Sequence, residues 1–213
     1  MLKKFVLFEG EKVYPSKIVC VGRNYVKHIQ ELNNEIPEDI VLFIKPNSSI
    51  GIPDFKRYDY KIHYEGEISF LIGKEIGYGD RVDKSVFKGI GFGIDFTMRD
   101  LQKKLKEKGL PWEKAKAFDG GAYFSEFKKI PKELDLNNIE FYLKINDKSV
   151  QRSSSSNMLF KPLTIVENII KYFKLDEGDI IMTGTPEGVG IINPKDVIEY
   201  EIKGIVKGKK TFL

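Results

Sequence analysis

The sequence predicts an α+β fold in which a mixed, curled β-sheet carries helices at its margins. Short apolar runs rich in β-branched residues recur along the 213 residues, separated by Gly, Pro, Asn and Asp. Segments with helical spacing are few and do not alternate with the strands, so regular βαβ units are not expected. No repeat, low-complexity stretch or long linker divides the chain. We therefore expect one domain over residues 1–213.

Seven runs have the length and composition of β-strands, and most of them are followed directly by a residue that favours turns. The glycine-rich run that ends at Ile94 is apolar throughout, which predicts a buried strand. The predicted strands are Lys17–Val21, Ile40–Ile44, Ile68–Ile72, Ile90–Ile94, Glu140–Ile145, Asp179–Thr183 and Val197–Ile202.

Three segments predict helices, each placed beside a strand in the chain. The second segment begins with Thr97 and Asp100, whose spacing resembles a capping box, and Gly109 would end it. The third segment has apolar residues at helical spacing, which favours a helix packed on the core. The predicted helices are Tyr25–Leu32, Thr97–Lys108 and Leu163–Phe173.

The charged residues indicate neither a nucleic-acid partner nor a membrane. A net charge of +4 comes from 35 basic and 31 acidic residues spread along the chain. We expect the lysine-rich stretches Lys103–Lys108 and Lys207–Lys210 to be solvated faces. No apolar run approaches the 18 or so residues of a membrane span. The first residues have too short an apolar segment for a secretory signal, so a cytoplasmic location is expected.

Glu65 and Glu67 lie two residues apart in the stretch His63–Ile72, just before the predicted strand Ile68–Ile72, and if the whole stretch is extended their side chains point to one face. Two adjacent carboxylates repel each other unless a cation lies between them. Gly66 would leave room close to the backbone. Taken alone, this spacing favours an edge strand with a solvated polar face.

Asp95 favours a metal site over a solvated edge strand, because it ends the apolar strand just where a helix is expected to begin. A buried, unpaired carboxylate there would be costly. Cys20 is the only cysteine, which excludes an intrachain disulfide and a thiolate-rich metal site. Three carboxylates predict a hard oxygen site that suits Mg²⁺, with Mn²⁺ or Ca²⁺ as alternatives.

Six motifs in order resemble the fumarylacetoacetate hydrolase superfamily, in particular its small acylpyruvate hydrolase and oxaloacetate decarboxylase members. The resemblance implies the β-sandwich roll of the fumarylacetoacetate hydrolase C-terminal domain, and it implies that Glu65, Glu67 and Asp95 bind the metal. The motifs are Val21-Gly-Arg-Asn-Tyr25, Phe43-Ile-Lys-Pro46, Tyr64-Glu-Gly-Glu67, Asp95-Phe-Thr-Met-Arg-Asp-Leu-Gln102, Gly109-Leu-Pro-Trp-Glu-Lys-Ala-Lys116 and Thr183-Gly-Thr-Pro-Glu-Gly-Val-Gly190.

The same resemblance implies the catalytic residues. Lys116 matches a lysine beside the metal that binds a substrate carboxylate or stabilises an enolate. His28 and Glu31 match a pair that orients and deprotonates water, and a spacing of three makes them neighbours on a helix. Without the resemblance, that spacing favours an ordinary surface contact. His63, two residues before Glu65, is the other candidate base.

Arg23, Gln102 and Thr185 match positions that contact substrate or shape the pocket in relatives. Arg23 could bind a carboxylate through two parallel N–H bonds. One stretch departs from the family pattern, because Gly120 and Gly121 replace larger side chains that would line the pocket. We therefore expect this departure to affect the size of the substrate rather than the chemical step.

The resemblance implies a hydrolase that cleaves a C–C bond of an acylpyruvate, a 2,4-dioxo acid, through an enolate that a metal stabilises. The products would be pyruvate and a carboxylic acid. Decarboxylation of oxaloacetate and isomerisation of a 2-hydroxyhepta-2,4-diene-1,7-dioate type substrate need the same enolate and stay open. A non-catalytic binding domain is the least favoured alternative, because all three metal-binding carboxylates and the lysine of the family pattern are present. The expected partners are a small 2-oxo acid and, because relatives are often homodimers, a second copy of the chain.

Overall fold

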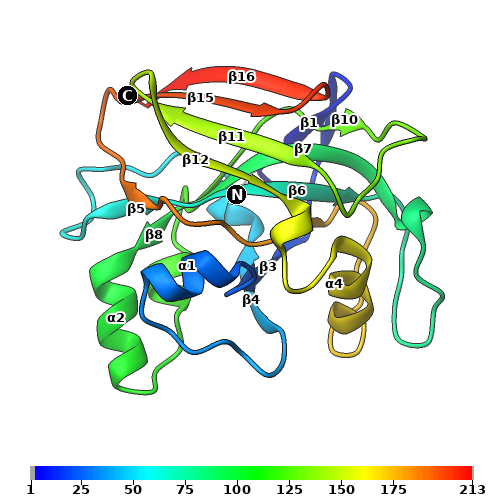
Figure 1. Cartoon of the computed structure of the whole chain (residues 1–213), viewed down its shortest axis with the longest axis horizontal. Helices are drawn as coiled ribbons and strands as arrows, with labels where there is room; N and C mark the ends of the chain where they lie inside the picture. Colours follow the sequence, from blue (N-terminus) through cyan, green and yellow to red (C-terminus); the bar gives the residue numbers. More distant parts are fainter. Residues whose placement is uncertain (1–2, 213) are drawn as a thin grey trace.

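The structure is a computed structural model that describes residues 3–212. Its strands form sheets of seven, four, three and two strands. In Figure 1 the four-stranded sheet lies along one side of the central strands, and the three longer helices lie along the other side. Strands β6 (Gly66–Ile72) and β7 (Phe87–Asp95) therefore belong to a central layer that is covered from both sides.

The seven-stranded sheet has the order β10-β7-β6-β13-β3-β4, with β9 pairing beside β7. Its strands are β3 (Lys17–Gly22), β4 (Val41–Pro46), β6 (Gly66–Ile72), β7 (Phe87–Asp95), β9 (Ala122–Phe124), β10 (Lys128–Lys129) and β13 (Ile180–Met182). The four-stranded sheet comprises β11 (Glu140–Ile145), β12 (Lys148–Ser154), β15 (Val197–Ile202) and β16 (Val206–Thr211). The smaller sheets comprise β1 (Val6–Phe8), β2 (Glu11–Val13), β5 (Ile62–Tyr64), β8 (Thr97–Met98) and β14 (Gly190–Ile191).

The helices are short and sit at the margins of the sheets. They are α1 (Val26–Glu31), α2 (Arg99–Glu107), α3 (Glu113–Lys116) and α4 (Pro162–Ile169), with single 3-10 turns at Asn47–Ser49, Lys84–Val86 and Ser155–Asn157. No helix among residues 3–212 is long and apolar enough to cross a membrane.

The core between the two larger sheets is aromatic. The ring of Phe92 on β7 stacks on that of Tyr200 on β15 with a centroid distance of 4.7 Å, and Phe141 on β11 lies 6.1 Å from Phe92. Burying side chains of this kind stabilises the fold by roughly 1.5–3 kcal/mol each. On the opposite face of β7, a Cβ at Gly91 would lie 2.9 Å from the ring of Phe127. Glycine is needed there because the aromatic ring packs directly on the backbone.

The antiparallel pairing of β6 and β7 brings the start of one strand beside the end of the other. Gly66 pairs with Ile94 and Glu67 pairs with Gly93. The backbone N–H of Asp95 donates to the carbonyl of Glu65 at 2.9 Å. Residues that lie about thirty positions apart in the sequence are therefore adjacent in space.

The predicted fold class is confirmed, because the structure is a mixed, curled sheet with few peripheral helices. The predicted capping box is wrong, because Thr97 lies in β8. Helix α2 begins two residues later at Arg99, without a side-chain cap. The hydroxyl of Thr97 accepts a hydrogen bond from Lys116 Nζ at 2.6 Å instead. The hydroxyl of Thr97 therefore takes part in a tertiary contact with Lys116 and does not cap the helix.

Candidate active site

Three buried carboxylates converge at the junction of β6 and β7. Glu65 lies in the break between β5 and β6, Glu67 lies on β6, and Asp95 ends β7. Their exposed fractions are 5 %, 1 % and 1 %. One oxygen from each residue lies within 4.8 Å of an oxygen from both others. This separation suits three oxygen ligands around one divalent cation.

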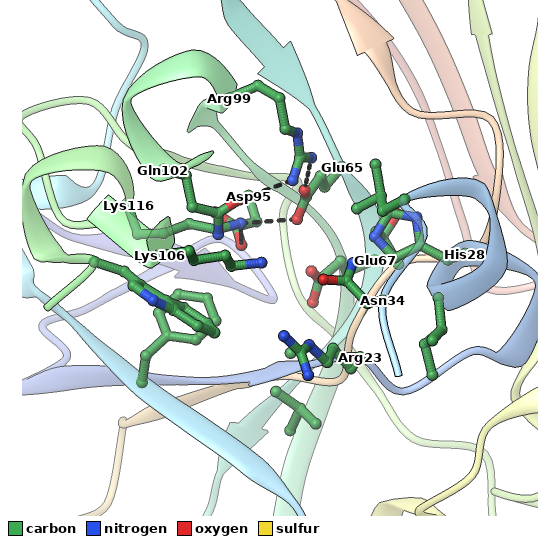
Figure 2. A pocket seen from close by; sticks show the side chains of 17 residues that line it. Arg23, His28, Asn34, Glu65, Glu67, Asp95, Arg99, Gln102, Lys106 and Lys116 are labelled. Carbon is green, nitrogen blue, oxygen red and sulfur yellow. Dashed lines mark hydrogen bonds and ion pairs between the residues drawn. The ribbon is translucent and has the colours of Figure 1, made fainter. Parts of the chain in front are cut away.

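Cationic side chains surround the carboxylates. Lys116 Nζ donates to Glu65 Oε2 at 2.8 Å and to Asp95 Oδ2 at 2.6 Å. The fully buried Lys45 on β4 forms an ion pair with Asp95 Oδ1 at 2.8 Å, and Arg99 at the start of α2 forms one with Glu65. Figure 2 shows the ammonium of Lys116 and the guanidinium of Arg99 both close to Glu65. Asp95 accepts a hydrogen bond at Oδ2 and faces the charge of Lys45 at Oδ1.

These charges set the protonation of Glu65 and Glu67 in opposite directions. Burial raises the pKa of Glu65, but the charges of Lys116 and Arg99 outweigh burial and hold the pKa well below its ordinary value. Burial and the negative charges of Asp95 and Glu65 raise the pKa of Glu67 well above its ordinary value. The carboxylate of Glu67 accepts the N–H of Gly184 at 2.7 Å.

Within residues 3–212, Glu67 has no lysine, arginine or histidine nitrogen within 4.0 Å. It is therefore the carboxylate that carries uncompensated like-charge repulsion, and a cation between Glu65, Glu67 and Asp95 would remove that repulsion. The donor set is oxygen only, which is the set that Mg²⁺, Mn²⁺ and Ca²⁺ prefer. The residues present therefore fit a divalent cation.

His28 and Glu31 lie together on α1, as the resemblance implied. His28 Nδ1 lies 3.2 Å from Glu31 Oε2, and His28 lines the same cavity as the carboxylates. Burial lowers the pKa of His28 below its ordinary value, although the charges of Glu65 and Glu31 oppose this shift. Because a carboxylate only accepts, Nδ1 carries the proton and Nε2 keeps the lone pair. The imidazole is therefore neutral and basic near pH 7.

The three residues predicted to contact substrate also line this cavity. Arg23 adopts a left-handed backbone with φ of 57° in the turn after β3, and Figure 2 shows its guanidinium directed into the pocket. Gln102 on α2 accepts from Arg99 at 2.9 Å. The hydroxyl of Thr185 donates to the carbonyl of Gly66 at 2.9 Å, so its proton is not free to bind a substrate.

Other expectations are corrected by the structure. Gly120 and Gly121 do not line the cavity that holds the carboxylates. Gly120 has φ of +76° and packs on Ile52, and a Cβ at Gly121 would lie 2.9 Å from the carbonyl of Lys116. These glycines serve close backbone packing rather than pocket size. His63 lies on β5, and it does not line the cavity either.

Three further cations lie at the site, and the sequence motifs did not predict them as site residues. Lys45 and Arg99 bind the carboxylates, and Lys106 on α2 lines the cavity. The prediction that the whole lysine-rich stretch 103–108 is a solvated face is therefore wrong at Lys106. A usable signal existed, because Arg99, Gln102 and Lys106 follow the spacing i, i+3, i+7 that places side chains on one helical face.

Comparison with known proteins identifies the family. A family model described as fumarylacetoacetate (FAA) hydrolase C-terminal matches residues 17–212. The chain belongs to this family. It is 38 % identical over 205 residues to an oxaloacetate tautomerase of Escherichia coli, covering 90 % of each chain.

Solved structures of the fumarylacetoacetate hydrolase family share the fold. A fumarylpyruvate hydrolase from Pseudomonas aeruginosa in complex with Mn²⁺ and pyruvate superposes with a TM-score of 0.89 and 25 % identity, covering 100 % of this chain and 97 % of the other. A structure from Oleispira antarctica, provisionally described as a fumarylacetoacetate isomerase/hydrolase, has a TM-score of 0.90 and 35 % identity and covers 100 % of both chains. These relatives differ in reaction but are enzymes that act on small molecules.

Proposed function

We propose that this protein is a divalent-metal-dependent enzyme that forms the enolate of a small 2-oxo acid, and that it cleaves an acylpyruvate with water. One observation carries the proposal: three buried carboxylates that suit a cation face the same cavity as a cationic lysine and a neutral His–Glu pair. The similar fumarylpyruvate hydrolase, which binds Mn²⁺ and pyruvate, supports it.

Glu65, Glu67 and Asp95 would hold the cation, with Mg²⁺ as the first candidate and Mn²⁺ as the alternative. When bound, the cation supplies Lewis-acid stabilisation of the negative charge that develops on the 2-oxo oxygen. Lys116 would add a second positive charge there. Burial lowers the pKa of Lys116, but the charges of Asp95 and Glu65 outweigh burial and raise it, so the ammonium stays protonated.

His28 and Glu31 would supply the base. Glu31 holds Nδ1–H, and the free Nε2 takes a proton from water as the water oxygen bonds to the 4-oxo carbon. The bond between carbons 3 and 4 then breaks, and its electron pair forms the enolate of pyruvate. The carboxylic acid leaves, and a proton delivered to carbon 3 completes pyruvate. The step consumes one water and needs no redox partner.

Keto–enol conversion or decarboxylation of oxaloacetate is the second candidate. The 38 % identity to an oxaloacetate tautomerase favours it. The same residues could serve, since His28 could move a proton at carbon 3 and Lys116 would stabilise the same enolate. Loss of the carboxylate beta to the 2-oxo group as CO₂ needs no activated water. Isomerisation of a 2-hydroxydienoate, a third candidate, needs only proton transfers.

One set of assays separates the candidates. Acetylpyruvate and oxaloacetate are each incubated with the protein and Mg²⁺, Mn²⁺ or excess chelator, and ultraviolet absorbance and pyruvate are followed. We expect metal-dependent release of pyruvate from acetylpyruvate, and a loss of about 10²- to 10⁴-fold in His28→Gln. Oxaloacetate turnover without acetylpyruvate cleavage would replace the hydrolase by the second candidate. Turnover that persists in chelator would contradict both.

A further inference from the structure

Lys106 lies where the inner cavity meets an outer groove. It lines the cavity that contains the three carboxylates, and it also lines a groove of about 360 Å³ between α2 and the segment 31–34. Figure 2 shows its ammonium directed into the open centre of the pocket, toward the space that the Arg23 guanidinium also faces. Lys106 is therefore placed to meet the part of a substrate that extends away from the carboxylates.

The charge of Lys106 is not neutralised by a carboxylate. Within residues 3–212, no Asp or Glu oxygen lies within 4.0 Å of its Nζ, which sits 4.7 Å from the centroid of the Trp112 ring. Its charged neighbours include the cations Arg23, Arg99 and Lys116, and Glu65 is the acidic one among the main influences. Burial and these cations lower the pKa of Lys106 to about 8. An anion bound beside it would relieve this repulsion.

The groove beyond Lys106 does not attract anions in the same way. Of its charged lining residues, Arg99 and Lys106 lie at the junction with the cavity, and beyond them the acids Glu31, Asp100 and Glu107 accompany only one base, Lys103. Positive charge is therefore concentrated at the junction of the cavity and the groove, and not along the whole path. A second negative group of a bound molecule would be held at this junction.

We propose that Lys106 is a specificity residue that pairs with the distal carboxylate of the substrate, so that the enzyme prefers 2-oxo dicarboxylic acids to 2-oxo monocarboxylic acids. This inference rests on the proposed function, because it assumes that the 2-oxo acid end lies beside Glu65, Glu67, Asp95 and Lys116. It does not depend on whether the enolate is used for hydrolysis, tautomerisation or decarboxylation.

The test compares two unreactive ligands that differ only at the distal end. Malate and 2-hydroxybutyrate share a 2-hydroxy acid head, and a methyl group in the second replaces the distal carboxylate of the first. Each is titrated into Mn²⁺-loaded protein by calorimetry at pH 7. Oxalate, which has no distal group, reports on the inner site. Because the readout is binding, the test stays decisive even if the proposed reaction fails.

Lys106→Met is the test variant and Lys104→Met is its matched control. Lys104 lies on the same helix, but it is exposed, sits 5.5 Å from the ring centroid of Tyr60, and lines neither the cavity nor the groove. We expect the wild-type protein and Lys104→Met to bind malate at least about tenfold more tightly than 2-hydroxybutyrate, in line with a charged hydrogen bond. In Lys106→Met this ratio should fall to within about threefold, with oxalate binding unchanged.

Two results would overturn the proposal. The first is an unchanged malate preference in Lys106→Met, in particular if Arg23→Met abolishes it, since Arg23 would then be the residue that binds the distal carboxylate. The second is the absence of any malate preference in the wild-type protein. Failure of the proposed function can be distinguished from both results, because neither acetylpyruvate nor oxaloacetate would then be turned over with metal present.

Discussion

Lys45 and Asp95 form an ion pair of 2.8 Å that is almost completely enclosed, with side-chain exposures of 0 % and 1 %. Lys45 Nζ also donates to the carbonyl of Gly121 at 2.9 Å and to that of Lys116. One ammonium thus ties β4 to the end of β7 and to the segment that follows α3.

Replacing Lys45 should therefore destabilise the whole protein. Lys45→Met removes the ion-pair partner of Asp95 Oδ1 and one hydrogen bond to each of the carbonyls of Lys116 and Gly121, and breaking a buried pair in this way costs about 3–5 kcal/mol. Urea denaturation measures the change. Lys203→Met removes an exposed lysine paired with Glu140, and should change the free energy of unfolding by less than about 1 kcal/mol. Similar losses in the two variants would contradict the structural role assigned to Lys45.

Glu67→Gln should separate stability from metal binding. In chelator the variant should be as stable as the wild type or more stable, because it removes a buried carboxylate repelled by Asp95 and Glu65. Mn²⁺ should raise the melting temperature of the wild type and leave that of the variant unchanged, since only the wild type offers a third charged ligand. Thermal melts with and without Mn²⁺ provide the comparison. Equal stabilisation by Mn²⁺ would place the cation elsewhere.

The pH dependence of turnover should report on His28. Its pKa is lowered by burial, so the neutral form that can take a proton from water is present from pH values below the ordinary 6.5 upward. We expect the acid limb of kcat/KM for acetylpyruvate to have its midpoint below 6.5, and to disappear in His28→Gln along with most of the activity. An acid limb that is retained in the variant would assign the base to another group.

The preference for malate should fall as pH rises, whereas the activity that depends on neutral His28 should rise with pH. Lys106 binds an anion only in its protonated form, and its pKa is lowered to about 8 by burial and by Arg23, Arg99 and Lys116, against the charge of Glu65. The ratio of malate to 2-hydroxybutyrate affinity should therefore be full at pH 7 and fall as pH rises beyond the pKa of the bound form. Calorimetry from pH 7 to 10 tests this, and Lys106→Met should show a flat ratio.

The carboxylates were predictable because each carries a local signal. Glu65 and Glu67 alternate around a glycine, which predicts two like charges on one face, and Asp95 ends an apolar run, which predicts its burial. Their convergence needs the antiparallel pairing of β6 and β7, which no local pattern specifies. For the same reason the short strands β5 and β8 were missed, since strands of two or three residues exist only through their partners.

The cations around the site were harder to predict because lysine and arginine are usually solvated. Lys45 follows an apolar strand and precedes a proline, and nothing in this context indicates an exposed fraction of 0 %. Thr97 carried a helix-capping signal that a lysine nineteen residues later overrides. Arg99 and Lys106, in contrast, share a helical face with Gln102, so the position of one predicted substrate contact could have indicated the other two.

Anomalous diffraction at the manganese edge, from a crystal of the protein grown with Mn²⁺ and oxalate, locates the cation. We expect one strong anomalous peak coordinated by Glu65, Glu67 and Asp95, with oxalate completing the shell and Lys116 displaced from at least one carboxylate toward it. A peak at any other position, or carboxylates that remain paired only with Lys116 and Arg99 in a saturated crystal, would contradict this expectation.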